Sequence, residues 1–254
     1  MLASSTDAKK QDVTVNRVQP NNIQTISKSR WFATLGLGSL LFAIALFASH
    51  SYPSIFLDLP MSGFTFAYVA PVFLILTLLA VFLSLKLVNY NFSDIGLSFR
   101  AFGKEALIGL LVASAWTLLQ FFVIIPATGG AERMDIVANL EQLGTDYAGL
   151  FAFLLMAILG GGIAEEVFFR GFFLTSLRNS FGNSQVATAL AVIITTIVFA
   201  LLHGYQGWIG ILDTAVFGGL SMSLLYLWRK NLTACIVAHG LYDVFAVLIL
   251  FFYF

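Results

Sequence analysis

Charged residues are scarce in this sequence of 254 residues. Asp, Glu, Lys and Arg make up 10% of the chain and apolar residues 59%, and the mean hydropathy is +0.91. An average soluble domain has about 25% charged and about 45–50% apolar residues. The composition therefore excludes an ordinary soluble domain and indicates an integral, multi-pass membrane protein in contact with the lipid bilayer.

Cysteine is almost absent as well. Cys235 is the single one, which excludes an internal disulfide and a thiolate cluster for a metal ion. We expect Cys235 to be a small packing residue. The alternating strand patterns of an outer-membrane barrel are missing. The net charge is zero, and no nucleic-acid partner is expected.

Long apolar windows fill most of the chain. A helix needs ~20 largely apolar residues to cross a bilayer, and helices satisfy their own backbone hydrogen bonds in lipid. We therefore predict an all-α polytopic membrane protein, a bundle of about seven transmembrane helices, or eight if the fourth window is split. The windows are roughly 31–49, 63–85, 105–125, 148–178, 185–204, 207–228 and 232–254.

The polar segments predict the topology. Residues 1–30 have no apolar core, which favours a disordered cytoplasmic tail over a cleavable signal peptide. Threading seven spans alternately leaves Arg133 as the one basic residue on the far side, so the positive-inside rule places the N-terminus in the cytoplasm and the C-terminus outside. An eighth span would reverse the C-terminus. We expect a bacterial cytoplasmic membrane as the location.

The two halves of the chain differ in their polar content. Residues 31–144 have few polar residues within their windows, so we expect scaffold helices there. In the loop 126–144, Ile136, Leu140 and Leu143 fall at helical spacing, which predicts either a helix flat on the membrane surface or a loop with one or two helical turns.

Ionisable residues lie in or at the edges of the later apolar windows. An ionised side chain at the bilayer centre costs about 2.5–3.5 kcal/mol, so such residues must face inward and find partners, and they are functional candidates by default. They are Glu165, Glu166, Arg170, His203, Asp213, His239 and Asp243. Of these, Asp213 is expected to be a helix-end or packing partner.

The stretch EEVFFR contains two adjacent glutamates whose side chains point in different directions on a helix. Neighbouring residues on a helix point about 100° apart, so Glu165 and Glu166 cannot both face one site. Glu166 and Arg170 are spaced i, i+4 with the glutamate first, the favourable order for a salt bridge. Glu165 is left without a local partner. The preceding Gly160, Gly161 and Gly162 permit a kink, close helix packing or close approach of a substrate backbone.

Two further i, i+4 pairs follow in FALLH and HGLYD. They place Phe199 with His203, and His239 with Asp243, on one helix face each. A rise of 1.5 Å per residue from the cytoplasmic helix ends brings both histidines and Asp243 to depths that allow one shared cavity with Glu165 near mid-membrane. The third histidine, His50, is expected in an extramembrane loop.

A glutamate and two histidines in a secluded polar cavity suit hydrolysis. Glu165 is a candidate general base on water, a role that contributes ~10²–10⁴-fold, and His203 is a candidate to hold and polarise that water. His239 is a candidate donor to an oxyanion, especially if Asp243 favours its charged form. A G-x-S-x-G elbow and an H-E-x-x-H motif are both absent.

The order EEVFFR, FALLH, HGLYD resembles the signature of the CPBP family, also called the abortive-infection family, which comprises CAAX prenyl endopeptidases of the second type and bacteriocin-processing enzymes. The family pattern is E-E-x-x-x-R, F-x-x-x-H and H-x-x-x-N on separate helices, and the resemblance covers roughly residues 145–250. It implies an intramembrane endopeptidase with a catalytic transmembrane core at 145–254. The implied substrate is a membrane-embedded or lipidated protein or peptide.

The resemblance also implies roles for single residues. Glu165 takes the position of the catalytic base, His203 that of its water-binding partner, and His239 and Asp243 those of the oxyanion-side pair. Glu166 and Arg170 form a supporting pair. Phe199 is one of 26 phenylalanines, and on its chemistry alone we expect a core aromatic residue at the cavity wall. The chain departs from the family at Asp243, where asparagine is common. Ionised aspartate only accepts hydrogen bonds, so Asp243 either donates when protonated or orients and charges His239.

Three alternatives stay open at this stage. Glu165, His203 and His239 are acceptable zinc ligands, which makes a zinc-dependent protease the runner-up. We favour the reading that requires no cofactor, because the sequence offers no third histidine nearby and no remaining base. A transporter or proton relay also buries such residues. A non-proteolytic bacteriocin-immunity or scaffold protein would use the same fold without cleavage.

Overall fold

The computed structural model describes residues 26–254 of the chain. Most of the predicted disordered tail, residues 1–30, therefore lies outside the described residues. The end of that tail is helical, because α1 (Lys28–Leu46) begins before the predicted window. Ser27 caps this helix, and its side chain accepts a hydrogen bond from the backbone N–H of Arg30 at 3.3 Å.

Every regular element within residues 26–254 is a helix, which confirms the all-α prediction. Seven helical runs of this part of the chain are long and apolar enough to cross a membrane. The fourth window is one continuous run of 34 residues and is not split in two. The runs are Lys28–Leu57, Gly63–Val88, Phe102–Ala127, Tyr147–Ser180, Gln185–Leu202, Gly204–Arg229 and Leu232–Tyr253.

The runs combine α-, π- and 3-10 helical segments. After α1, the α-helices are α2 (Tyr52–Leu57), α3 (Phe66–Leu85), α4 (Phe102–Leu119), α5 (Ile125–Ala127), α6 (Met134–Leu143), α7 (Tyr147–Leu155), α8 (Thr175–Ser180), α9 (Gln185–Leu202), α10 (Gly207–Asp213), α11 (Met222–Arg229) and α12 (Leu232–Tyr253). The π-helical segments are η1 (Phe47–Ser51), η5 (Gln120–Ile124), η7 (Met156–Glu165), η8 (Val167–Leu174) and η10 (Thr214–Ser221). The 3-10 segments are η2 (Gly63–Thr65), η3 (Lys86–Val88), η4 (Phe92–Ile95), η6 (Gly130–Glu132) and η9 (Gly204–Gln206).

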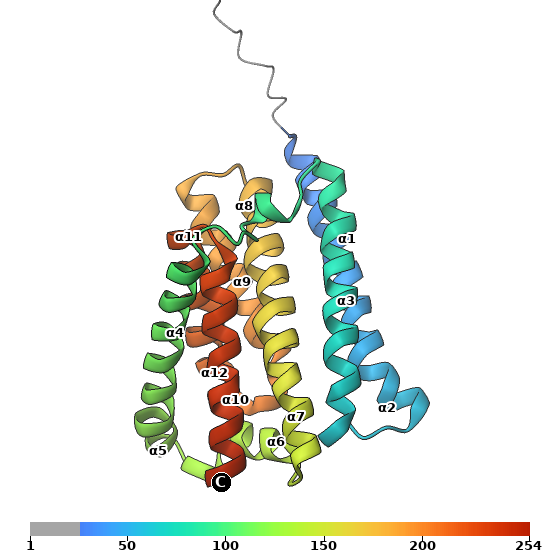
Figure 1. The fold of residues 1–254 in the computed structure, drawn as a ribbon. Coiled ribbons are helices and arrows are strands. Elements are labelled where there is room, and N and C mark those ends of the chain that lie inside the picture. The colour runs from blue at the N-terminus through green and yellow to red at the C-terminus, as the bar shows by residue number, and fades with distance from the viewer. Residues whose placement is uncertain (1–25) are drawn as a thin grey trace, which may run out of the picture.

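The spans stand side by side as a bundle (Figure 1). α1 and α3 pack together at one edge, and α4 packs along α12 at another. The first described helix starts at one end of the bundle and α12 finishes at the opposite end, as an odd number of spans requires. The short helices α2, α5 and α6 lie at the end where the chain terminates.

The fourth span forms the centre of the bundle. All residues of η8 are buried, and its phenylalanines pack on neighbouring spans. The ring of Phe168 stacks on that of Phe42 from α1 with centroids 3.6 Å apart, and the ring of Phe169 meets that of Phe199 from α9 edge to face at 5.0 Å. Cys235 is buried, which confirms it as a packing residue. The fourth span is thus held from several sides.

The segment 126–144 contains a helix of ten residues, α6, as one of the two predictions has it. Ile136 and Leu143 are buried in a cluster with Val247 and Leu250 of α12, and Leu140 packs against that cluster. The apolar face at helical spacing is therefore covered by protein. This contact holds α6 across one end of the bundle.

His50 lies elsewhere than predicted. It belongs to η1 and so to the first membrane-spanning run, not to an extramembrane loop. The helix continues past the predicted window because its polar residues find local partners. Ser49 donates a hydrogen bond to the carbonyl of Ala45 at 2.7 Å, and its oxygen lies 2.8 Å from Nδ1 of His50.

Candidate active site

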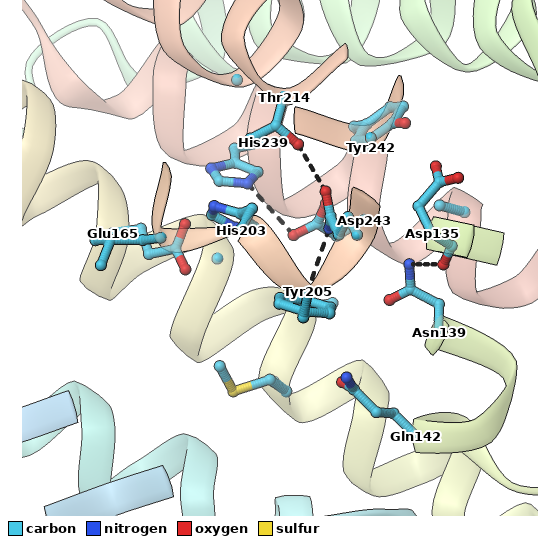
Figure 2. Close-up of a pocket in the computed structure, with 18 of the residues that line it drawn as sticks. Asp135, Asn139, Gln142, Glu165, His203, Tyr205, Thr214, His239, Tyr242 and Asp243 are labelled. Carbon is cyan, nitrogen blue, oxygen red and sulfur yellow. Dashed lines mark hydrogen bonds and ion pairs between the residues drawn. The ribbon is translucent and has the colours of Figure 1, made fainter. Parts of the chain in front are cut away.

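The predicted site residues meet at one cavity of about 720 Å³. Three spans bring them there from positions that are distant in the sequence. Glu165 comes from η7, His203 from the end of α9, and His239 and Asp243 from α12 (Figure 2). Phe199 also lines the cavity. The depths estimated from the sequence allow Glu165, His203, His239 and Asp243 to share a cavity, and these side chains do line one.

Glu166 and Arg170 form the predicted ion pair behind the cavity wall. Both side chains are 0% exposed, and Arg170 Nη1 lies 2.9 Å from Glu166 Oε1. Arg170 Nη2 also donates a hydrogen bond to the carbonyl of Gly218 in η10. Its guanidinium carbon lies 4.4 Å from the centroid of the Phe199 ring, a cation–π contact. The pair thus joins the fourth, fifth and sixth spans.

His239 is held between two carboxylates. Its Nδ1 lies 2.7 Å from Glu166 Oε1, and its Nε2 lies 3.5 Å from Asp243 Oδ2. Because an ionised carboxylate only accepts hydrogen bonds, Nδ1 carries the proton toward Glu166. The contact with Asp243 follows the i, i+4 spacing. The contact with Glu166 crosses between spans, and no spacing within the sequence predicts it.

His203 is oriented by the end of its own helix. It is the residue at which α9 stops, with φ −96° and ψ 23°. Its Nδ1 lies 2.9 Å from the backbone carbonyl oxygen of Phe199. A carbonyl oxygen can only accept, so Nδ1 is the donor and Nε2 of the neutral ring keeps its lone pair. The i, i+4 pair predicted from FALLH therefore fixes the tautomer of His203.

Glu165 differs sharply from its neighbour. It is half-buried and lines the cavity, whereas Glu166 is fully buried in the ion pair. Within residues 26–254, Glu165 makes no ion pair, and its buried Oε2 has no hydrogen-bond partner. Helix geometry predicted this division of the two glutamates, and it holds although the segment is π-helical.

The three glycines before Glu165 serve different contacts. A Cβ atom on Gly161 would collide with Oδ2 of Asp243 and lie 3.5 Å from Nε2 of His239. A Cβ on Gly162 would lie 2.9 Å from the Cα of Gly240 in α12. Gly162 therefore allows close helix packing, while Gly161 leaves room beside the two polar side chains of the cavity.

Asp213 is the packing partner that the sequence predicts. Its Oδ2 lies 2.5 Å from Nη2 of Arg133, and the same nitrogen lies 2.8 Å from Oδ2 of Asp135. Burial opposes the charge of Arg133, but the hydrogen bonds that its guanidinium donates to Asp135 and Asp213 outweigh burial and raise its pKa. The ion pairs of Arg133 with Asp135 and Asp213 link the start of α6 to the end of α10.

Sequence reasoning missed several polar residues of the cavity wall. They are isolated in apolar or loop segments, so no motif or spacing singles them out. They come from the first, third and sixth spans, from α6 and α12, and from η9. The residues are His50, Gln120, Asp135, Asn139, Gln142, Tyr205, Gln206, Thr214 and Tyr242.

Glu165, His203 and His239 are also the candidate ligands for a metal ion. Across the part of the chain that the structure describes, no three His, Cys, Asp or Glu side chains are grouped so that they could hold a metal ion. Glu165, His203 and His239 share the cavity without forming such a group. The arrangement of these side chains does not fit a zinc centre.

Comparisons with known proteins find two similarities. Residues 147–245 match the family model of Rce1-like type II CAAX prenyl endopeptidases. The chain is 28% identical over 145 residues to the membrane-embedded CAAX protease MroQ of Staphylococcus aureus (strain USA300). That alignment covers 56% of this chain and 56% of the relative, so the chain spans little more than half of the relative's length. No solved structure gives a significant match.

The matched segment contains all three motifs, from Glu165 to Asp243. Two findings thus agree with the resemblance that the motifs carry, one from a family model and one from a curated relative. The family-model match at residues 147–245 includes the glutamate and both histidines that line the cavity. Residues 147–245 of the chain are therefore similar to Rce1-like type II CAAX prenyl endopeptidases.

Proposed function

We propose that this protein is an intramembrane endopeptidase that hydrolyses a peptide bond with Glu165 and His203 acting on water, without a metal ion. The observation that carries the proposal is the contrast between the two adjacent glutamates. Glu166 is consumed by an ion pair, whereas Glu165 lines the cavity with no ion pair among the described residues. A free carboxylate in a secluded cavity is what a general base requires.

His203 supplies the second contact to water. Its Nδ1 is engaged by the Phe199 carbonyl, so Nε2 accepts a hydrogen bond from the water that Glu165 deprotonates. The water oxygen then attacks the carbonyl carbon of the scissile bond while its proton passes to Glu165. The tetrahedral intermediate collapses when Glu165 returns that proton to the leaving nitrogen, which breaks the C–N bond.

His239 stabilises the negative charge that develops on the carbonyl oxygen. A doubly protonated ring keeps Nδ1 on Glu166 and presents Nε2–H at the cavity beside Asp243. A preorganised donor of this kind is worth about 3–4 kcal/mol in the transition state. Asp243 acts by orienting and charging His239, because an ionised carboxylate cannot donate to an oxyanion.

The substrate is a membrane-embedded or lipidated protein or peptide, since residues of the membrane-spanning runs line the cavity. The protein resides in a bacterial cytoplasmic membrane with its N-terminus in the cytoplasm, as the distribution of Lys and Arg supports. This orientation directs the cavity end that carries α6 away from the cytoplasm.

The test compares membrane peptides by mass spectrometry from cells that carry the wild-type protein or a variant. Glu165→Gln and His203→Ala should each abolish one or more cleaved products, while Glu165→Asp retains a fraction of them. If folded variants leave all products unchanged, the protease proposal is refuted. Ion or solute flux that depends on the same residues, with no cleaved product, would instead support a transporter.

A further inference from the structure

Gln120 is a buried amide that nothing in the proposed mechanism uses. It is 4% exposed and stands where α4 passes into the π-helical segment η5. It lines the cavity with its side chain near the Tyr242 hydroxyl, yet its Oε1 is buried and has no hydrogen-bond partner within residues 26–254. Burying an amide without a hydrogen bond is unfavourable. A ligand that donates a hydrogen bond to Gln120 Oε1 would remove this cost.

The surroundings of Gln120 place it beside the catalytic residues of the proposal. Trp116, one turn earlier on the same face of α4, also lines the cavity. Its ring lies 6.3 Å from that of Tyr242 and 5.3 Å from that of Phe217. Tyr242 directly precedes Asp243 on α12, and α4 packs along α12. Gln120 therefore faces the part of the cavity that His239 and Asp243 also line.

The chemistry of the site selects a neutral ligand with both a donor and an acceptor. A side-chain amide offers two N–H donors and a carbonyl acceptor. Its neighbours Trp116, Phe217 and Tyr242 carry no charge. A peptide bond has the matching groups. A substrate must leave its helical conformation to expose a scissile bond, and its freed backbone N–H and C=O groups then need partners because the bilayer supplies none.

We propose that Gln120 is a substrate-binding residue whose side-chain amide hydrogen-bonds the backbone of an extended peptide beside His239 and Asp243. The proposal rests on the endopeptidase function above. Trp116 and Tyr242 form the apolar wall against which the peptide lies. Glu165 and His203 then meet a peptide bond whose neighbouring backbone groups are held in place.

The experiment measures binding of a defined probe, the peptide dansyl-Leu-Leu-Ala-Leu-Leu-amide, to purified full-length protein in detergent. All proteins carry Glu165→Gln so that no cleavage interferes. Gln120→Met keeps the length of the side chain but removes its hydrogen bonds. We expect the dissociation constant to rise about five- to tenfold, as the loss of one hydrogen bond predicts. Gln185→Met, at an exposed residue at the start of α9 that does not line the cavity, is the matched control and should bind as before.

Backbone ester analogues of the probe separate direct contact from a structural effect. Each analogue replaces one backbone N–H by oxygen, which removes a donor and weakens a carbonyl acceptor. One analogue should bind about five- to tenfold more weakly when Gln120 is present and no more weakly when it is Met. Equal losses in both proteins, an unchanged constant in Gln120→Met, or no binding to either protein would overturn the proposal.

Folding and the proposed function are monitored separately. Gln120→Met should unfold at nearly the same temperature, because it removes a buried amide oxygen that has no hydrogen-bond partner within residues 26–254. If it fails to fold, Gln120→Leu and the ester series in the Gln120 protein take its place. Peptide binding that depends on Gln120, in a protein whose Glu165 form cleaves nothing, would refute the protease function but keep the binding site.

Discussion

Substitution by glutamine should lower stability at Glu166 and cleavage activity at Glu165. Glu166 Oε1 lies 2.9 Å from Arg170 Nη1 and 2.7 Å from His239 Nδ1, and the side chains of Glu166 and Arg170 are 0% exposed. Glu166→Gln keeps the shape but removes the charge, which leaves the Arg170 cation buried without its counterion. Breaking a buried pair in this way costs about 3–5 kcal/mol of the unfolding free energy.

Glu165→Gln should leave stability nearly unchanged. Glu165 lines the cavity and makes no ion pair among residues 26–254, so we expect a change of about 1 kcal/mol or less. Its cleavage rate should instead fall ~10²–10⁴-fold, since the general base is removed. Thermal unfolding in detergent and product formation measured by mass spectrometry report the two effects independently.

A double variant tests the physical reason. Glu166→Leu with Arg170→Met removes both charges, and replacing a buried pair by apolar residues is often neutral or stabilising. The double variant should therefore unfold at a higher temperature than Glu166→Gln. The reasoning is refuted if Glu166→Gln is as stable as the wild type, or if Glu165→Gln is the destabilised variant.

Three further predictions follow from single contacts. Gly161→Ala should lower the cleavage rate more than about tenfold, because its Cβ collides with Asp243 Oδ2, whereas Gly160→Ala meets only the flexible Met156 side chain and should stay active; equal activities would contradict this. Arg133→Met should lower the unfolding free energy by about 3–5 kcal/mol, because it leaves Asp135 and Asp213 partly buried without their counterion; a thermal unfolding curve that matches the wild type would count against it. Metal analysis of purified active protein should find less than stoichiometric zinc, and chelators should leave cleavage intact; stoichiometric metal required for activity would restore Glu165, His203 and His239 as ligands.

Helical periodicity and the cost of buried charge predict much of this site from the sequence. They assign Glu166 to Arg170, pair His203 with Phe199 and His239 with Asp243, and leave Glu165 for the cavity. All of these relations are local to one helix, where spacing determines which side chains meet. The seven spans are predicted for the same reason, because each is read from its own composition.

Relations between spans could not be predicted in this way. The contact of His239 with Glu166 depends on how α12 is rotated against the fourth span, and spacing within either span carries no such information. His50 was placed in a loop because the apolar window ends near it, whereas η1 extends the helix. Gln120 gave no signal, since a lone amide in an apolar span belongs to no motif.

The single oxygen shared by Arg170 and His239 has a consequence for related sequences. Glu166 Oε1 serves both partners, and Arg170 in turn holds the Gly218 carbonyl and the Phe199 ring. A relative that loses Arg170 would have a carboxylate with only a histidine to balance it. Changes at these positions should therefore occur together, and a sequence that keeps Glu166 while replacing Arg170 by an apolar residue should carry a new cation on a neighbouring span.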